Sequence, residues 1–214
     1  MEWINPMRRF FGVSQRLVVG LAVLACLPWI TQAQAQTSKV LSGADAVAGT
    51  TAASCPTLLQ HAPLRLQDEK PQSLCQYAGQ VVVVVNTASF CGFTSQYKEL
   101  EALNTRYKAR GLVVLGFPSN DFSQEKGSNA EIAAFCENTF GVKFPMFAKS
   151  VVSGKEASPF FKQLADKTGT PPRWNFYKYV IARDGSMVTS FNSMTSPDSR
   201  SFVQEIEKQL LLKR

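Results

Sequence analysis

The feature of this chain that most constrains its fold is a run of five consecutive valines at residues 81–85. An unbroken run of β-branched residues is typical of a strand buried on both faces, in a sheet covered by helices on each side. The next segment, residues 86–94, reads NTASFCGFT and places Cys91 between the end of this strand and the start of a helix. Free N–H groups and the dipole at a helix N-terminus favour a thiolate over a thiol. Cys91 is therefore a candidate nucleophile; the alternative is a cysteine that packs as a small hydrophobic residue.

Further helices and strands follow this first strand in alternation. The hydrophobic patterns predict helices over residues 95–110 and 159–167, a strand over residues 112–117, and a two-stranded hairpin over residues 177–181 and 187–191. Parallel strands joined by a crossover helix, followed by an antiparallel hairpin and a last helix, describe an α/β protein. We expect a thioredoxin-like fold, with a central mixed β-sheet flanked by helices.

Two more helices are indicated by their start signals. Residues 128–131 read SNAE, a capping box that opens a helix whose inward face carries Cys136. Ser196 and Pro197 predict the start of the last helix, with its apolar residues facing the sheet. The inward-facing residues expected on these two helices are Ile132, Phe135, Cys136, Val203, Ile206 and Leu210.

The N-terminal region has the pattern of an export signal. Arg8, Arg9 and Arg16 precede an apolar run at residues 17–30, and residues 33–35 read AQA. We interpret residues 1–35 as a signal peptide cleaved near Ala35, which predicts a periplasmic or secreted protein. The alternative is a lipoprotein cleaved before Cys26. Residues 36–53 are rich in small and polar residues and predict a flexible linker, so residues 54–214 form the folded domain.

Charge and apolar-segment length exclude several function classes. The formal net charge of the chain is +7, but no basic run or stripe accompanies it, so we expect no nucleic-acid partner. The apolar run at residues 17–30 is short for a membrane span, so we expect no stable membrane association. The single histidine, His61, lies outside any metal-binding pattern, and we expect no metal site.

Four cysteines follow the predicted signal peptide: Cys55, Cys75, Cys91 and Cys136. Four cysteines allow three pairings, and an exported chain permits two disulfides. We expect a structural disulfide between Cys55 and Cys75, with free thiols at these positions as the alternative. Closing a loop of this length stabilises the fold by about 3 kcal/mol in the chain-entropy model.

Three separate segments resemble the signatures of the glutathione peroxidase family. These are residues 86–94 (NTASFCGFT), residues 115–125 (LGFPSNDFSQE) and residues 174–176 (WNF), and the resemblance extends over residues 58–211. It implies that Cys91 is the peroxidatic cysteine and that Gln124, Trp174 and Asn175 complete a catalytic tetrad. It also implies peroxide reduction without a metal, haem or flavin. The chain departs from the family pattern in having one residue fewer between Phe122 and Gln124.

Cys136 indicates a branch of this family. Its position resembles that of the resolving cysteine in the thioredoxin-dependent branch, which implies that a sulfenic acid on Cys91 condenses with Cys136 to a disulfide. We expect the helix that carries Cys136 to unwind locally during this step, because a disulfide requires Cα atoms within about 7 Å. The alternative is that Cys136 is a core residue. The short connection at residues 147–173 resembles that of monomeric members, which implies a monomer that uses a thioredoxin-like protein in preference to glutathione.

The sequence is also consistent with other functions. One alternative is a peroxide sensor or relay that oxidises a partner protein, and another is a one-cysteine, glutathione-dependent peroxidase; both use Cys91. A disulfide oxidoreductase is disfavoured because Thr94 stands where a C-x-x-C motif needs its second cysteine. A copper chaperone is disfavoured because no second cysteine or histidine lies near Cys91 in the sequence.

Overall fold

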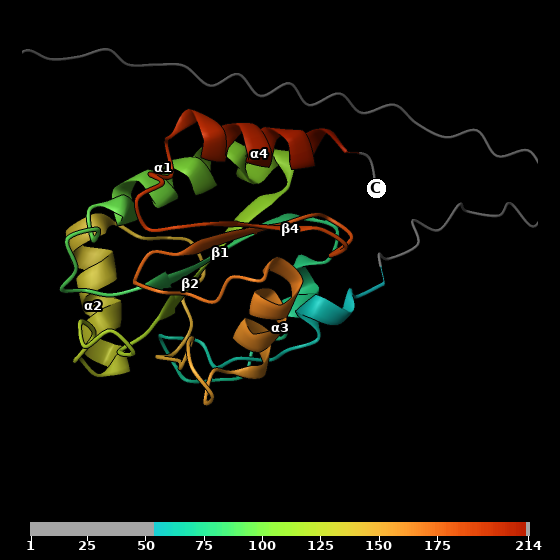
Figure 1. The fold of residues 1–214 in the computed structure, drawn as a ribbon. Coiled ribbons are helices and arrows are strands. Elements are labelled where there is room, and N and C mark those ends of the chain that lie inside the picture. The colour runs from blue at the N-terminus through green and yellow to red at the C-terminus, as the bar shows by residue number, and fades with distance from the viewer. Residues whose placement is uncertain (1–53, 213–214) are drawn as a thin grey trace, which may run out of the picture. The chain divides into compact units, whose positions relative to one another are not determined.

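The computed structural model describes residues 54–212 (Figure 1). The α-helices and strands are β1 (Val81–Thr87), α1 (Gln96–Tyr107), β2 (Leu112–Pro118), α2 (Asn129–Phe140), α3 (Pro159–Thr168), β3 (Lys178–Ile181), β4 (Val188–Phe191) and α4 (Arg200–Leu211). Three 3-10 helices accompany them: η1 (Thr57–Leu59), η2 (Leu74–Tyr77) and η3 (Lys108–Arg110). The predicted signal peptide and linker lie outside the described residues.

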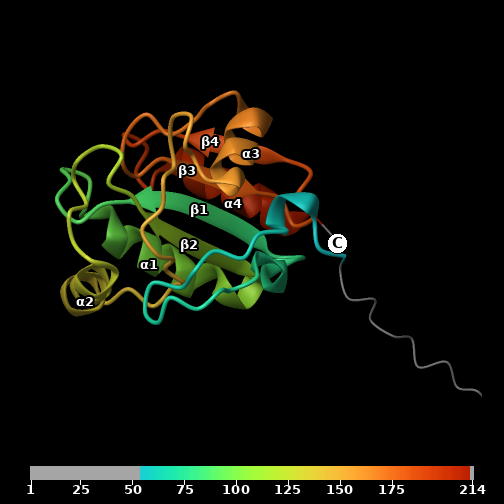
Figure 2. The same ribbon diagram turned by 90° about the horizontal axis from the view of Figure 1, so that it is seen from below.

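The strands form one mixed sheet in the order β2-β1-β3-β4. Strand β1 pairs in parallel with β2 and antiparallel with β3, so that Val83 lies between Val114 and Val180. Strands β3 and β4 form the antiparallel hairpin expected from the sequence. Figure 2 shows the four strands in this order, with α2 at the end of the sheet where β1 ends. The thioredoxin-like α/β fold is therefore confirmed.

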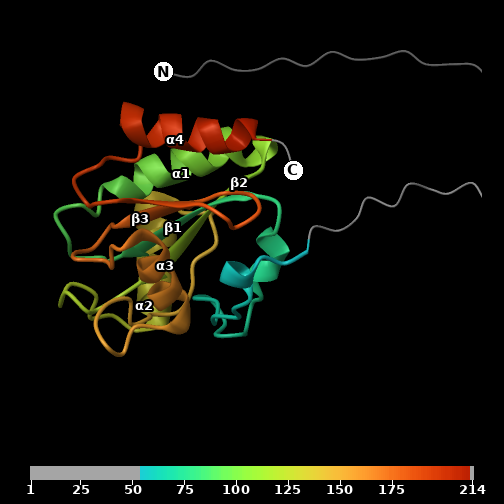
Figure 3. The same cartoon turned by 45° about the vertical axis from the view of Figure 1, so that its right-hand side comes forward.

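The five valines explain why the sheet needs helices on both faces. Val81, Val83 and Val85 enter one core cluster, together with side chains from α1, α2 and α4. Val82 and Val84 point the other way, into a cluster with α3 and the two 3-10 helices η1 and η2. Figure 3 shows α1 and α4 on one face of the sheet and α3 on the other. Since side chains alternate along a strand, every valine is buried.

Helix α2 begins and ends as its sequence predicts. The Ser128 hydroxyl accepts a hydrogen bond from the Glu131 N–H, and the Glu131 carboxylate accepts one from the Ser128 N–H, which completes the capping box. Gly141 ends the helix in the left-handed conformation, with φ 62°. Ile132 and Cys136 are buried against the core, and Phe135 is half-buried.

The last helix begins later than predicted. Helix α4 starts at Arg200, and residues 196–199 form a turn in which the Ser199 N–H donates to the Ser196 carbonyl. The Ser196 hydroxyl bonds to side chains within and beyond this turn, so Ser196 and Pro197 form a turn in place of a helix start. The inward face also differs: Phe202, Ile206 and Gln209 are buried, whereas Val203 and Leu210 are half-buried.

The segment before β1 is fastened to the domain by a disulfide. Cys55 and Cys75 are bonded to each other with their Cα atoms 5.1 Å apart, and the bond joins the start of the domain to η2. Within this segment, Leu64 pairs with Pro71 in an isolated antiparallel bridge. Among residues 54–212, no helix has the length and apolar character needed to cross a membrane.

Candidate active site

Cys91 lies in the loop between the end of β1 and the start of α1. Thr94 fixes this loop: its hydroxyl accepts from the Cys91 N–H at 3.0 Å and lies within hydrogen-bond distance of the Cys91 and Ala88 carbonyls, at 2.7 and 3.0 Å. The Phe93 N–H donates to the Cys91 Sγ atom at 3.5 Å. Cys91 is half-buried and free. The sulfur therefore receives a backbone donor just before α1.

Gln124 reaches the Cys91 loop from the segment after β2. Its carbonyl accepts from the N–H of Phe90, the residue before Cys91, at 3.1 Å. Ser123 has a left-handed backbone with φ 59°, and the Glu125 N–H donates to the Asn120 side chain at 3.0 Å. These two features turn the chain so that Gln124 lies beside the loop. The shorter spacing before Gln124 therefore does not carry it away from the Cys91 loop.

Trp174 and Asn175 approach from the segment before β3. Asn86, at the end of β1, holds this segment: its amide donates to the Trp174 carbonyl at 3.0 Å and its side-chain oxygen accepts from the Tyr177 N–H at 3.0 Å. Asn175 is fully buried, and its side-chain N–H donates to the Gln124 side-chain oxygen at 2.8 Å. The structure thus brings Gln124 and Asn175 into direct contact across 51 residues of sequence.

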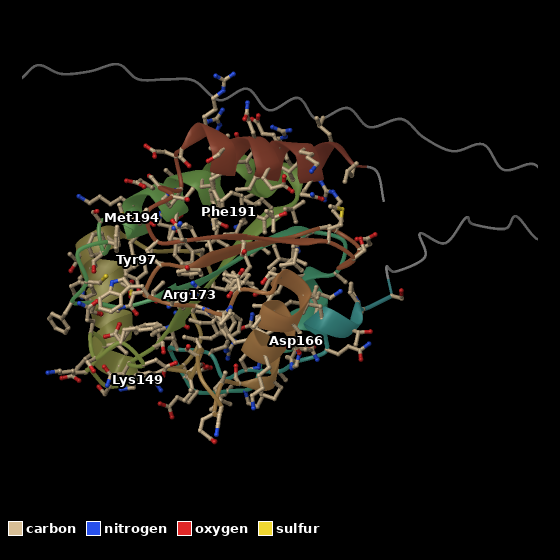
Figure 4. The ribbon with its side chains drawn as sticks, viewed as in Figure 1. Tyr97, Lys149, Asp166, Arg173, Phe191 and Met194 are labelled. Atoms are coloured by element: carbon tan, nitrogen blue, oxygen red, sulfur yellow. A yellow bond between two sulfur atoms is a disulfide. The ribbon has the colours of Figure 1, made fainter. Side chains whose placement is uncertain are left out.

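Trp174 has a different environment from Asn175. Its ring packs against Phe122 with centroids 5.5 Å apart, and 41% of the residue is exposed. Phe90, next to Cys91, is 69% exposed, and Met194 is 78% exposed. Figure 4 shows Met194 and Tyr97 on the same side of the domain as α2. Large apolar side chains are therefore accessible around the segments that carry Cys91, Trp174 and Ser193.

Cys136 is free and lies inside the core, with only 2% of its surface exposed. Burial raises its thiol pKa to about 11; the Glu125 carboxylate adds to this rise, whereas the Tyr97 hydroxyl opposes it. Cys91 packs against the same core cluster that contains Cys136. The two thiols are therefore unjoined and contact one core cluster, with Cys136 protonated at neutral pH.

Two buried polar residues at this site were not predicted from the sequence. Glu125 is fully buried, accepts a hydrogen bond from the Ser89 hydroxyl at 3.0 Å, and lines a cavity of about 420 Å³ with Phe90 and Phe135. Burial raises the pKa of its carboxyl. Lys178 is also fully buried, within β3. No local sequence pattern marks either residue as buried.

Among residues 54–212, no group of three or more histidine, cysteine, aspartate or glutamate side chains is placed to hold a metal ion. Besides the Glu125 carboxylate, the polar groups gathered at the site are amides, hydroxyls and a thiol. Such groups donate hydrogen bonds to oxygen or sulfur, which suits a reaction between a thiolate and a bound oxygen substrate.

Comparison with known proteins identifies relatives of the whole domain. A family profile described as glutathione peroxidase matches residues 59–165. The glutathione peroxidase-like peroxiredoxin gpx1 of Schizosaccharomyces pombe is 44% identical over 137 residues, which cover 62% of this chain and 87% of that protein. The hydroperoxy fatty acid reductase gpx1 of Synechocystis is 42% identical over 157 residues, covering 67% of this chain and 90% of that protein. A solved structure, described as Trgpx in apo form, has a TM-score of 0.59 and 33% identity, and the match covers 74% of this chain and 98% of that one.

Proposed function

The chain belongs to the glutathione peroxidase family, and from this premise we propose that it reduces hydrogen peroxide and organic hydroperoxides with Cys91 as the nucleophile. The observation that carries the proposal is the convergence of two further chain segments, those of Gln124 and Asn175, on the Cys91 loop. The Phe93 N–H donates to the sulfur, the Gln124 carbonyl accepts from Phe90, and the Gln124 side chain accepts from Asn175.

In the first step, the Cys91 thiolate attacks one peroxide oxygen. A sulfur–oxygen bond forms as the oxygen–oxygen bond breaks, Cys91 becomes a sulfenic acid, and the departing alkoxide or hydroxide takes a proton to leave as alcohol or water. The Gln124 oxygen is occupied by Asn175, so its side-chain N–H groups face away from that bond and are available as donors. Neutral amide and indole donors, from Gln124, Asn175 and Trp174, hold the reacting oxygens without a competing charge.

In the second step, the Cys136 thiol attacks the sulfenic sulfur. A Cys91–Cys136 disulfide forms, and the thiol proton leaves with the hydroxyl group as water. A buried thiol with a pKa of about 11 is a poor nucleophile, because the thiolate is the reactive species. We therefore propose that the part of α2 around Cys136 opens locally before the disulfide forms, which exposes the thiol and lowers its pKa.

In the third step, a dithiol protein of the thioredoxin type reduces the Cys91–Cys136 disulfide by thiol–disulfide exchange. The connection between residues 147 and 173 contains only α3 as a helix or strand, which supports the comparison with monomeric family members. The accessible Phe90 and Trp174 side chains support access by apolar hydroperoxides and by a partner protein. The hydroperoxy fatty acid reductase among the relatives supports apolar hydroperoxides as substrates.

We also propose that the protein acts outside the cytoplasm, as a monomer, after removal of residues 1–35. The Cys55–Cys75 disulfide supports this location, because structural disulfides persist in oxidising compartments and are rare where thiols are kept reduced. The predicted cleavage near Ala35 would be tested by N-terminal sequencing of the protein recovered from a periplasmic extract. Recovery of a chain that begins at Cys26 and carries lipid would favour the lipoprotein alternative.

The proposed function is tested by turnover assays with two reducing systems, in which NADPH consumption is coupled either to thioredoxin and its reductase or to glutathione and its reductase. Wild type should turn over with thioredoxin, and Cys91→Ser should lose about 1000-fold or more of that activity, since the nucleophile is absent. Cys136→Ser should still consume one equivalent of peroxide but should not turn over with thioredoxin.

Two of the alternatives, a non-resolving Cys136 and a one-cysteine peroxidase, have distinct results in these assays. Turnover of Cys136→Ser with thioredoxin at the wild-type rate would show that Cys136 does not resolve the sulfenic acid. Turnover of wild type and Cys136→Ser with glutathione alone would identify the one-cysteine peroxidase. A Cys91→Ser protein with wild-type activity would overturn the proposed function altogether.

A further inference from the structure

Lys178 is an ionisable side chain in the interior of the domain. It lies in β3, between β1 and β4, where its register partners are the uncharged residues Val85 and Phe191. None of its surface is exposed. Burial lowers its pKa to about 7, and the charge that opposes this effect is the Glu99 carboxylate on α1. A buried ammonium group is costly unless acceptors surround it, so the contacts of Lys178 identify what it stabilises.

The ammonium group of Lys178 bonds to two acceptors that belong to different segments. Its Nζ atom donates to the Gln96 side-chain oxygen at 2.8 Å and to the Phe176 carbonyl at 2.7 Å. Gln96 is the first residue of α1, and its N–H donates to the Phe93 carbonyl within the Cys91 loop at 2.9 Å. Lys178 therefore joins the base of the Cys91 loop to the segment that precedes β3.

The second contact stabilises an unusual backbone at Phe176. This residue has a left-handed conformation with φ 62°, which is unfavourable for a bulky side chain. Its carbonyl accepts from Lys178, and its N–H donates to the Asn86 carbonyl at 2.6 Å. Because Asn175 and Trp174 immediately precede Phe176, this conformation determines how both residues are presented to the Cys91 loop.

The contact of Lys178 with Gln96 also leads, through further hydrogen bonds, to Asn175. The Gln96 amide donates to the Ser193 carbonyl at 2.8 Å, and the Ser193 hydroxyl donates to the Asn175 carbonyl at 2.6 Å. Gln96, Ser193 and Asn175 are all buried, so water does not compete for these bonds. Asn175 in turn donates to Gln124. A continuous set of hydrogen bonds thus runs from Lys178 to the amide pair beside Cys91.

We propose that Lys178 is a positioning residue for peroxide reduction, which holds Asn175 and Trp174 against the Cys91 loop through the Phe176 carbonyl and through Gln96 and Ser193. The inference rests on the proposed peroxidase function and adds a residue that touches neither peroxide nor Cys91. Replacing a buried charge by an apolar side chain of similar size is often neutral or stabilising. If Lys178 is a positioning residue, such a replacement should therefore lower activity while stability is kept or increased. If its role is purely structural, activity should fall only together with stability.

The test compares Lys178→Met with Lys98→Met, a matched substitution on the exposed face of α1. The measured quantity is the rate constant for oxidation of Cys91 by hydrogen peroxide, from rapid quenching and mass spectrometry of the trapped sulfenic acid. Lys178→Met should oxidise about 10- to 100-fold more slowly, as expected when donors lose their alignment. Lys98→Met should stay within about twofold of wild type.

The pH profile separates positioning from a general structural effect. Charge-assisted hydrogen bonds are stronger than neutral ones, so Lys178 should hold the network best while it is protonated. The ratio of the wild-type rate to the Lys178→Met rate should therefore decrease as pH rises through the Lys178 pKa of about 7. A ratio of one throughout would overturn the inference, and so would a constant ratio accompanied by loss of stability.

Two further variants test the positioning role of Lys178 if Lys178→Met does not fold. Ser193→Ala removes only the hydroxyl that donates to Asn175, and Gln96→Met removes the link between Lys178 and Ser193. Slower Cys91 oxidation in both folded variants supports the inference, and wild-type rates in both overturn it. Failure of wild type itself to oxidise Cys91 would instead overturn the proposed function, so the two failures are distinguishable.

Discussion

The buried lysine makes stability depend on pH in a way that the structure specifies. The ordinary pKa of Lys178 is 10.5, and burial lowers it to about 7 in the folded protein. Between these values the unfolded chain binds a proton that the folded protein does not, so the free energy of unfolding rises with pH. The slope of the free energy of unfolding against pH approaches about 1.4 kcal/mol per pH unit, and it diminishes near the pKa that Lys178 has in the folded protein. We expect a gain of about 2 kcal/mol in stability between about pH 7 and pH 9.

The assay is urea unfolding, followed by circular dichroism at several pH values, of wild type and Lys178→Met. Both proteins carry serine at positions 91 and 136, so that no free thiol titrates or exchanges. Wild type should gain the expected stability, and Lys178→Met should show a nearly flat profile over the same range. Above pH 10 the free energy of unfolding should fall in both proteins, because burial raises the pKa of Tyr97 and Tyr179 and the folded state keeps protons that the unfolded state loses. Equal slopes for the two proteins between pH 7 and 9 would refute the reasoning.

Three further predictions concern the scaffold. Gly116→Ala should lower the free energy of unfolding by about 1–3 kcal/mol, because an added Cβ would lie 2.2 Å from the Met146 sulfur; an unchanged urea midpoint would contradict this. Ser128→Ala should cost about 0.5–2 kcal/mol through loss of the α2 capping box, measured by thermal unfolding, with Ser128→Thr as the retained-cap control. Replacing Cys55 and Cys75 by serine should cost about 3 kcal/mol and should make stability insensitive to dithiothreitol, whereas wild type should lose stability in that reductant.

The sequence predicts the fold well where local pattern and burial agree. The valine run predicts β1 because a strand with both faces buried needs no polar alternation, and the structure buries all five side chains. The predicted start of the last helix is wrong. The Ser-Pro pair resembles the N-terminus of a helix, whereas the side-chain hydrogen bonds of Ser196 stabilise a turn there. The inward face of α4 shifts with that start, so that Phe202 and Gln209 are buried.

Some residues of the site are predicted from local sequence or from the family resemblance, whereas others are found only in the folded structure. Cys91 follows from its place between a buried strand and a helix, and the family resemblance supplies Gln124 and Asn175, which the structure joins by a hydrogen bond. Lys178 and Glu125 could not be predicted, because a charged residue in a sequence is normally assigned to the surface. Their burial depends on partners about 36 or 82 residues away in the chain, which only the folded structure brings together.

The central claim is that Cys91 reacts with peroxide and that Cys136 resolves the product. It is tested most directly by a non-reducing peptide map of the protein, with Cys91 and Cys136 reduced beforehand, quenched at short times after one equivalent of hydrogen peroxide. We predict rapid appearance of a Cys91–Cys136 disulfide, with Cys55–Cys75 already paired at the start. Sulfinic acid on Cys91 with Cys136 still free would rule out the resolving role of Cys136, and an unmodified Cys91 would overturn the proposed peroxidase function.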